Sequence, residues 1–424
     1  MDLHEATTTI AQPPEPISMS PEPRPTGVLL TGATGAVGGV LLARYLERTD
    51  RRVYVLVRGS HEREATARVR RLMQSLFDDE HPYGERVAVV RGDISRPNLG
   101  LRKRYDELAE SVSEITHCAA SVSFELDLEG SRASNVEGTR RMLEFAEHCQ
   151  GRGGLRRLCH VSTAYVAGEH NGSFSEDDLD TGQRFRNAYE RSKFEAESMI
   201  ARWRDRLPIT VLRPSIVVGE RGSGWTSAYN GLYWPLRAFA RGTITALPAR
   251  GEARVDVVPA DYVADATIAL GQMRETEGAT FHLTAGEHAT TVAEIVELAS
   301  AYFERPAPRL FDPWLYRRLV HPLLLRASRD ERLRRALTRS EIFFPYFDAS
   351  VIFDNRRTRV ALHRTDVRLT PLRTYFNQLA EFALEAEWGR RPAPRIMAPA
   401  GPLAVPVGQV RQQAETRARL VPAL

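Results

Sequence analysis

The 424-residue chain is poor in cysteine and has no long apolar run. Cys118, Cys149 and Cys159 are odd in number and lack metal-ligand spacing, so we expect reduced thiols rather than disulfides. No apolar stretch approaches the ~20 residues that span a bilayer, and the first residues lack the basic region and apolar core of a signal peptide. No internal repeat of fixed period is visible. These absences argue against a disulfide scaffold, an integral membrane protein and a repeat array, and they favour a cytoplasmic protein.

The composition is ordinary for a soluble globular protein. Hydrophobic residues make up 42% of the chain and charged residues 26%, which is ordinary for a protein with a buried core. The net charge of +4 mildly favours anionic ligands but does not point to nucleic acid. At this length the chain can form one large core or two smaller ones.

A glycine-rich turn joins a strand to a helix near the N-terminus. The stretch 28–39 reads Val-Leu-Leu-Thr-Gly-Ala-Thr-Gly-Ala-Val-Gly-Gly, and residues 40–46 continue at helical spacing. Gly32, Gly35 and Gly38 would let the backbone approach a pyrophosphate, and the helix N-terminus would offer it free N–H groups. Glycines also serve purely structural corners, but a strand before and a helix after is the context of a dinucleotide site.

Strand and helix patterns alternate after this turn. We predict strands at 53–57, 86–90, 115–120, 155–162 and 209–213, and helices at 64–77, 135–148 and 187–204. Repeated alternation of this kind is typical of an α/β fold of Rossmann type, a doubly wound parallel sheet.

Composition divides the rest of the chain. Residues 1–25 are proline-rich and predict a disordered tail, and 26–218 form the nucleotide-binding domain, to which later elements return. Residues 219–388 predict a smaller, mainly helical substrate region with helices at 261–273 and 291–304 and a strand at 279–284. A second flexible tail is expected at 389–424.

Tyr189 and Lys193 are the main candidates for chemistry. They stand four residues apart in a predicted helix and so share one face. A nearby ammonium favours the phenolate, so we expect a lowered tyrosine pKa and proton exchange with an alcohol oxygen. The spacing also occurs by chance, but here it follows a nucleotide turn, five strands and the pair Ser162-Thr163 at a strand end.

The sequence resembles the extended short-chain dehydrogenase/reductase family over residues 26–300, in particular its fatty acyl-CoA and thioester reductase branch. The motifs that carry the resemblance are residues 31–38, Gly92-Asp93, 135–139, Tyr189 with Lys193, His117 to Phe124, Val161 to Val166, 212–217 and Asp256 to Val263. A weaker similarity to the C-terminal region of fatty acyl-CoA reductases lies in Phe353-Asp354-Asn355 with Thr358.

The resemblance implies a catalytic triad of Thr163, Tyr189 and Lys193, with Ser162 a less favoured first member. It also implies a set of cofactor contacts, with Asp93 facing the adenine. That set is Thr31, Gly32, Thr34, Gly35, Ala36, Val37, Gly38, Arg58, Arg68, Asp93, Ile94, Ala119, Ala120, Ser162, Tyr189, Lys193, Pro214, Ser215 and Ile216.

The cofactor preference is predicted from the end of the second strand. NAD-binding proteins usually place an acid there for the ribose 2′-hydroxyl, whereas an arginine suits a 2′-phosphate. Arg58 follows the strand, and Arg68 or Arg70 on the next helix could assist, which favours NADPH. The alternative is that Arg58 is a solvated loop cation.

The leading hypothesis is NADPH-dependent reduction of a fatty acyl thioester, either acyl-CoA or acyl-carrier protein, to an aldehyde, which a second hydride could reduce to the alcohol. Two alternatives stay open. One is an extended family member that acts on a nucleotide sugar or a hydroxysteroid, and the other is a non-catalytic NADP-binding protein. Arg58 weighs against the first, and the intact set Thr163, Tyr189 and Lys193 weighs against the second.

The remaining conspicuous residues have simpler interpretations. Cys118 has no activating histidine at a recognisable spacing and is a weak candidate nucleophile. His117, His160 and His282 are more typical of structural residues than of metal ligands. The aromatic cluster 225–234 fits an acyl channel or simple packing about equally. The apolar and basic segment 314–337 fits a peripheral membrane contact, or a helix packed on its own domain.

Overall fold

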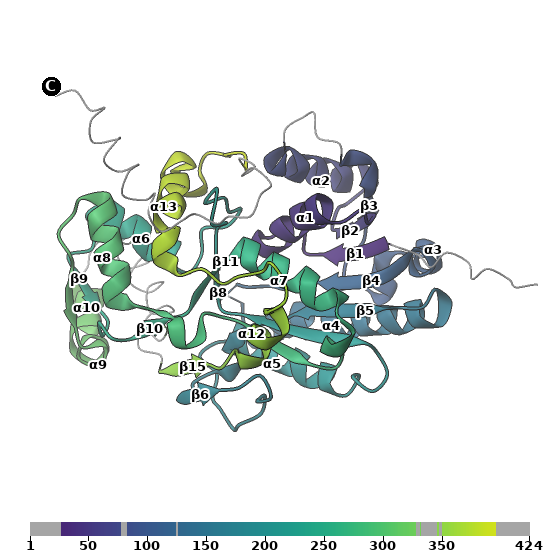
Figure 1. The fold of residues 1–424 in the computed structure, drawn as a ribbon. Helices are drawn as coiled ribbons and strands as arrows, with labels where there is room; N and C mark the ends of the chain where they lie inside the picture. The colour runs from purple at the N-terminus through teal and green to yellow at the C-terminus, as the bar shows by residue number, and fades with distance from the viewer. Residues whose placement is uncertain are drawn as a thin grey trace, which may run out of the picture.

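A seven-stranded parallel sheet forms the centre of the computed structural model, which describes residues 27–77, 83–123, 126–327, 331, 346 and 350–395 (Figure 1). The strand order is β12-β7-β5-β4-β1-β2-β3, and all neighbours pair in parallel. The chain order reverses between β1 and β4, which is where such sheets bind ligands beyond their carboxyl ends. The strands are β1 (Gly27–Thr31), β2 (Val53–Val57), β3 (Val87–Arg91), β4 (Val112–His117), β5 (Arg157–Val161), β7 (Ile209–Pro214) and β12 (Thr280–Leu283).

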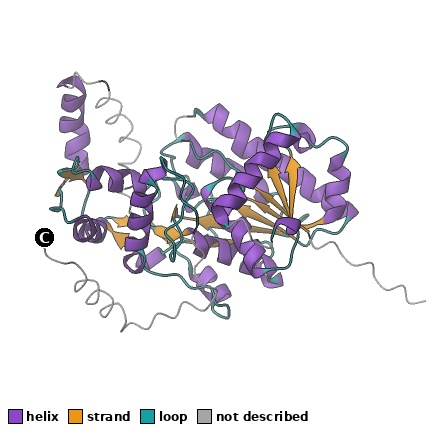
Figure 2. Ribbon diagram, turned by 90° about the horizontal axis from the view of Figure 1, so that it is seen from above, coloured by secondary structure: helices purple, strands orange, loops and turns teal. Residues whose placement is uncertain are grey.

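Helices cover both faces of this sheet, as Figure 2 shows from above. One face packs against α1 (Ala36–Arg48), α2 (Glu62–Leu76) and α7 (Ala260–Gln272). The other packs against α3 (Arg104–Ser111), α4 (Leu128–Arg152) and α5 (Ala188–Ala201). Because both faces are buried, the strands are almost continuously apolar, as in Val28, Leu29 and Leu30 of β1. The predicted Rossmann-type α/β fold is confirmed.

Two element boundaries differ from the prediction in ways that matter for the site. The strand predicted at 115–120 ends at His117, so Ala119 and Ala120 lie beyond it on the open edge of the sheet. The helix predicted at 135–148 begins at Leu128 instead, because Asp127 caps it by accepting a hydrogen bond from the Gly130 N–H at 2.8 Å.

The C-terminal part forms a third core around α6 (Tyr233–Ala240), α8 (Val292–Phe303) and α13 (Phe376–Glu385). The chain also forms small two-stranded sheets and short helices. They are β6 (Gly172–Phe174) with β15 (Val351–Phe353), β8 (Ile216–Val218) with β11 (Val257–Pro259), β9 (Ala246–Pro248) with β14 (Arg309–Phe311), β10 (Arg254–Val255) with β13 (Thr290–Thr291), α9 (Pro313–Leu315), η6 (Tyr316–Val320), α10 (His321–Ala327) and α12 (Arg356–Leu362).

The aromatic cluster 225–234 contributes to packing. Trp225 is buried against the core formed by α1 and α7. Tyr233 is buried in the third core, and its hydroxyl accepts the Gly219 N–H at 2.9 Å. These two rings therefore serve the packing alternative rather than an acyl channel.

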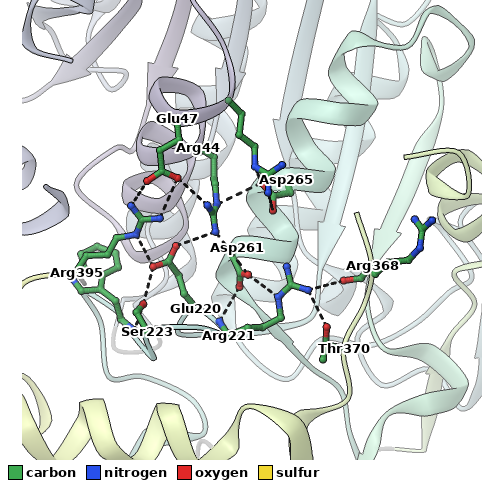
Figure 3. A network of polar contacts seen from close by, with 12 residues as sticks. Arg44, Glu47, Glu220, Arg221, Ser223, Asp261, Asp265, Arg368, Thr370 and Arg395 are labelled. Atoms are coloured by element: carbon green, nitrogen blue, oxygen red, sulfur yellow. Dashed lines mark hydrogen bonds and ion pairs between the residues drawn. The ribbon is translucent and has the colours of Figure 1, made fainter. Parts of the chain in front are cut away.

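A buried ionic network ties the C-terminal segment to the nucleotide-binding half (Figure 3). Arg44 of α1 pairs with Glu47 at 2.8 Å and with Asp265 of α7 at 3.5 Å. Arg395 donates to Glu220 at 2.6 Å and also pairs with Glu47, and its side chain is only 4% exposed. The packed structure thus continues through the first residues of the tail expected at 389–424, while 1–26 and 396–424 lie outside the described residues.

The Arg395→Ala substitution tests this attachment. Removing the guanidinium leaves the Glu220 and Glu47 carboxylates buried with fewer cations, since among the described residues only Arg44 still faces both. Loss of one partner of a buried ion pair is strongly destabilising, so we expect unfolding to become easier by about 3 kcal/mol. Thermal denaturation followed by circular dichroism measures the change.

Arg391→Ala is the matched control, because Arg391 lies nearby but is exposed. Its melting temperature should equal that of the unsubstituted protein. Equal melting temperatures for Arg395→Ala and Arg391→Ala would show that the segment does not stabilise the fold.

Candidate active site

The glycine-rich turn is held against the end of β4. Gly32 has a positive φ of 75°, and a side chain there would lie 2.7 Å from the Ala119 nitrogen. A Cβ on Gly38 would lie 2.0 Å from the Gly32 carbonyl oxygen. The N-cap of α1 is Gly35, so no side chain occupies the positive end of the helix. A cradle that only glycine fits, open at a helix N-terminus, suits the pyrophosphate of a dinucleotide.

Thr31 stabilises this turn by hydrogen bonds made within the protein interior. It is fully buried, and its hydroxyl accepts the Ala119 N–H at 3.1 Å and lies 2.8 Å from Nδ1 of His117. Its contribution to a cofactor site would therefore be to position the turn and the residues after β4. Thr34, Ala36 and Val37 lie in the turn and first helical residues themselves.

The predicted adenosine-side residues gather at the ends of β2 and β3. Arg58 follows β2 and is exposed, and Arg68 of α2 donates to its carbonyl oxygen at 2.7 Å. Asp93 follows β3, and its carboxylate accepts the backbone and hydroxyl hydrogens of Ser95 at 2.9 and 2.7 Å. Ile94 packs on Gly138 of α4. The structure thus places both arginines at the same edge as the glycine turn.

The hydroxyls of Thr163 and Tyr189 are brought together. Thr163 follows β5, is 4% exposed and caps the short helix η3 (Ala164–Ala167) by accepting the Tyr165 N–H at 3.2 Å. The Tyr189 hydroxyl lies beside the Thr163 side chain. Tyr189 lies in the first turn of α5 because Asn187 caps that helix, accepting the Glu190 N–H at 2.9 Å.

Lys193 lies one turn further along α5 and is buried. Its ammonium donates to the Val161 carbonyl oxygen at 2.9 Å, which fixes it beside the end of β5. Burial lowers the pKa of Lys193 to about 8. Burial raises the pKa of Tyr189 to about 12, and the neighbouring Thr163 side chain opposes that rise. We expected Lys193 to lower this pKa, but the exclusion of water from the phenol raises it instead.

Ser162 points to a different network. Its hydroxyl donates to Glu197 at 2.6 Å, and Glu197 accepts two bonds from Arg213 at 2.6 and 2.9 Å. Arg213 in turn contacts His282 at 3.1 Å, whose other ring nitrogen donates to the Asp354 carbonyl oxygen at 2.8 Å. The Ser162 hydroxyl is therefore occupied by a structural hydrogen bond, which favours Thr163 as the hydroxyl of the predicted triad.

The other candidates of this region have packing roles. Cys118 lies near Tyr189 and Lys193, but burial raises its thiol pKa to about 11, which disfavours a thiolate nucleophile. The rings of His117 and His160 lie 5.4 Å apart, and burial lowers the pKa of both, so they stay neutral. No group of metal ligands occurs among the described residues.

The loop after β7 lies beside Asp256, a buried carboxylate for which the sequence predicted no role. Pro214 accepts a bond from the Thr163 hydroxyl at 3.4 Å, and Ser215 lies beside Asp256. Asp256 accepts the N–H groups of Ala285 and Gly286, both at 2.8 Å, and burial raises its pKa to about 6. Its place within the motif 256–263 was the signal that could have identified it.

Residues 353–358, which resemble the C-terminal region of fatty acyl-CoA reductases, attach the C-terminal segment to the sheet. Glu176, which follows β6, accepts the Thr358 N–H and hydroxyl at 3.0 and 2.6 Å and the His282 N–H at 3.0 Å. Asn355 donates to the Thr284 carbonyl oxygen at 2.7 Å. These residues dock the C-terminal segment onto the end of β12.

With this geometry in hand, comparison with known proteins identifies the family. Residues 30–267, more than half of the chain, match the sequence profile of the NAD-binding domain described as male sterility protein. The chain belongs to this family. It has an NAD(P)-binding Rossmann domain and is similar to fatty acyl-CoA reductases and to the terminal R domain of a PKS-NRPS pathway.

The relatives divide into two groups. Fatty acyl-CoA reductase 1 of Mus musculus is 30% identical over 279 residues, 57% of this chain and 53% of the relative. A linear gramicidin synthase of Brevibacillus parabrevis is 30% identical over 264 residues, 60% of this chain and 5% of the relative. The chain therefore spans about half the length of the fatty acyl-CoA reductase and a small part of the gramicidin synthase.

Solved structures show the same fold. The terminal R domain from the myxalamid PKS-NRPS biosynthetic pathway superimposes with a TM-score of 0.74 at 27% identity, covering 88% of this chain and 93% of that one. UDP-glucuronic acid 4-epimerase from Bacillus cereus has a TM-score of 0.60 at 18% identity, covering 86% of this chain and 98% of that one. The second likeness concerns the fold alone.

Proposed function

We propose that this protein reduces a fatty acyl thioester, carried by coenzyme A or by a carrier protein, to an aldehyde with NADPH; a second hydride transfer would give the alcohol. The observation that carries the proposal is the convergence of the Thr163 and Tyr189 side chains beside the buried Lys193. The family and its fatty acyl-CoA reductase relatives support the choice of an acyl substrate.

The residues of the chain have distinct roles in this proposal. Bound NADPH would supply the hydride to the carbonyl carbon. Thr163 and Tyr189 would donate hydrogen bonds to the carbonyl oxygen and stabilise the negative charge that develops there. A Tyr189 phenol with a raised pKa is fully protonated at neutral pH, so it can give its proton to the oxyanion. Lys193 would hold the nicotinamide ribose.

A substrate panel discriminates this proposal from its alternatives. Purified protein is incubated with NADPH and, separately, acyl-CoAs, sugar nucleotides and steroids, and cofactor oxidation is followed at 340 nm. Oxidation with acyl-CoA alone supports the proposal. Turnover of a sugar nucleotide or steroid, or of no substrate despite NADPH binding, supports an alternative.

The preference for NADPH is tested by Arg58→Asp. Arg58 is exposed at the end of β2, where a 2′-phosphate would lie, so an aspartate there should repel NADPH and accept the NADH ribose hydroxyl. We expect the Kd for NADPH to rise at least tenfold while the Kd for NADH changes little, measured by fluorescence titration.

Arg202→Asp makes the same charge change on an exposed arginine at the far end of α5, and it should leave both affinities unchanged. An equal loss of both cofactors in Arg58→Asp, or no loss of either, means that Arg58 does not contact the 2′-phosphate.

Tyr189→Phe tests the chemistry. The ring stays to pack, so the fold and NADPH binding should change little, while turnover should fall by ~10²–10⁴, the usual effect of a positioned acid. A thiolate can leave without a proton on the carbonyl oxygen, so aldehyde reduction should suffer more than thioester reduction. Rates with acyl-CoA and with the matching aldehyde are compared, and full activity on both would exclude Tyr189 as the acid.

A peripheral membrane contact is a further proposal, for the exposed apolar surface on α9, η6 and α10. Trp314 and Leu323 are each 62% exposed and Leu319 is 52% exposed, and Arg318 and Arg326 accompany them. Apolar side chains flanked by arginines suit an anionic lipid surface. None of the described helices is long and apolar enough to cross a bilayer.

Co-sedimentation with phosphatidylglycerol vesicles measures this contact. The unsubstituted protein should sediment, and the double substitution Trp314→Ser with Leu323→Ser should reduce the bound fraction severalfold. Val360→Ser with Leu384→Ser, two exposed apolar residues elsewhere, is the control. Equal sedimentation of both double variants would reject this surface as the contact.

A further inference from the structure

A tyrosine from the C-terminal part of the chain inserts its hydroxyl into the start of α5. The Tyr346 hydroxyl donates to Glu190 at 2.7 Å and accepts from the Asn187 amide at 2.8 Å. Asn187 is the N-cap of α5, and its amide oxygen holds the Glu190 N–H. The hydroxyl therefore donates one hydrogen bond and accepts another, both at the start of the helix that carries Tyr189.

The acceptor in this pocket is a buried carboxylate. Glu190 has no exposed surface, and burial raises its pKa. Besides Tyr346 it accepts the Arg186 N–H at 2.9 Å and lies 3.4 Å from the Arg186 guanidinium. That guanidinium also lies over the Tyr346 ring, 5.5 Å from its centre, and donates to the Gly168 carbonyl oxygen. The Arg186 guanidinium therefore holds the Tyr346 ring. The Tyr346 hydroxyl is held as well, because a buried carboxylate such as Glu190 is unfavourable without full hydrogen bonding.

The ring of Tyr346 also contacts the segment that carries Thr163. It meets the Tyr165 ring edge to face, with centres 5.2 Å apart, and Tyr165 meets Phe353 of β15 in the same way at 5.6 Å. Tyr165 belongs to η3, which begins directly after Thr163. Tyr346 therefore touches both segments that supply the hydroxyls of the triad, through Tyr165 on one side and Glu190 on the other.

We propose that Tyr346 is a positioning residue for the reduction, which holds the first turn of α5 against η3 so that Tyr189 and Thr163 converge on one carbonyl oxygen. The inference rests on the proposed function for its catalytic consequence. Two catalytic hydroxyls on separate segments need such a tie, because small displacements of a positioned group cost large factors in rate. The proximity of the two side chains to each other does not by itself fix the backbone of either segment.

Tyr346→Phe removes the hydroxyl and keeps the ring contacts with Tyr165 and Arg186. We expect kcat for acyl-CoA to fall about tenfold, with the Kd for NADPH unchanged, because Lys193 and the glycine turn are untouched. Tyr375→Phe is the matched control: Tyr375 is buried in the same part of the chain, but its hydroxyl has no hydrogen-bond partner among the described residues. Its kcat should equal that of the unsubstituted protein.

A second measurement does not depend on activity. In protein labelled with ¹³Cζ-tyrosine, the Tyr189 resonance is assigned by its absence in Tyr189→Phe. It should shift or split in Tyr346→Phe and stay in place in Tyr375→Phe. Asn187→Ser is a second variant, since serine still caps the helix but cannot donate an amide hydrogen to Tyr346; it should move the same resonance and lower kcat.

The outcomes separate the two proposals. If the unsubstituted protein does not reduce acyl thioesters, the proposed function fails, and the Tyr189 resonance still reports on Tyr346. If thioester reduction occurs but kcat and the resonance are the same in Tyr346→Phe and the unsubstituted protein, the positioning role is wrong. A lower melting temperature with unchanged kcat and resonance also overturns it, because Tyr346 would then be a structural anchor alone.

Discussion

The close approach of the glycine turn to the end of β4 is the constraint on which the rest of the site depends. Gly32 leaves no room for a Cβ beside Ala119, and Thr31 holds the Ala119 N–H from the same turn. This contact is made at the point where the strand order of the sheet reverses. It sets the cradle for the pyrophosphate on one side and the backbone after β4 on the other, so that the end of β5 can face the same space.

A second constraint decides which hydroxyl faces that space. Glu197 and Arg213 form a pair that is almost completely buried, and Ser162 is drawn into it. A buried pair of this kind tolerates the loss of neither partner. Because this pair lies behind β5 and binds the Ser162 hydroxyl, Thr163 is the residue whose hydroxyl faces Tyr189. The same network continues through His282 to the segment 353–358, so the C-terminal part of the chain is attached directly behind the end of β5.

Features encoded within short stretches could be predicted from the sequence. The turn at Gly32, Gly35 and Gly38, the alternation of strands and helices, and the placement of Tyr189 and Lys193 one turn apart on a helix all depend on spacing along the chain. The Rossmann-type fold follows from them and is confirmed. The triad itself stays a prediction, although the structure brings its three residues to the end of β5.

Features that arise from distant parts of the chain could not be predicted in this way. Tyr346 lies 156 residues from Glu190, and Arg395 still further from Glu47, so no local pattern connects them. The pKa of Tyr189 depends on how completely the fold excludes water, which spacing does not report. The end of β4 at His117 is equally non-local, because Thr31 of the neighbouring strand fixes the residues after it.

The measurement that tests the central claim most directly is the transfer of deuterium. Protein is incubated with an acyl thioester and NADPH deuterated at C4 of the nicotinamide, on the face from which hydride leaves, and the products are analysed by mass spectrometry. The account predicts one deuterium at C1 of the aldehyde, two at C1 of any alcohol, and release of the free thiol in equal amount to the first deuterium transferred. Free thiol without deuterated aldehyde or alcohol would indicate hydrolysis, and it would contradict the assignment of this site to hydride reduction of a thioester.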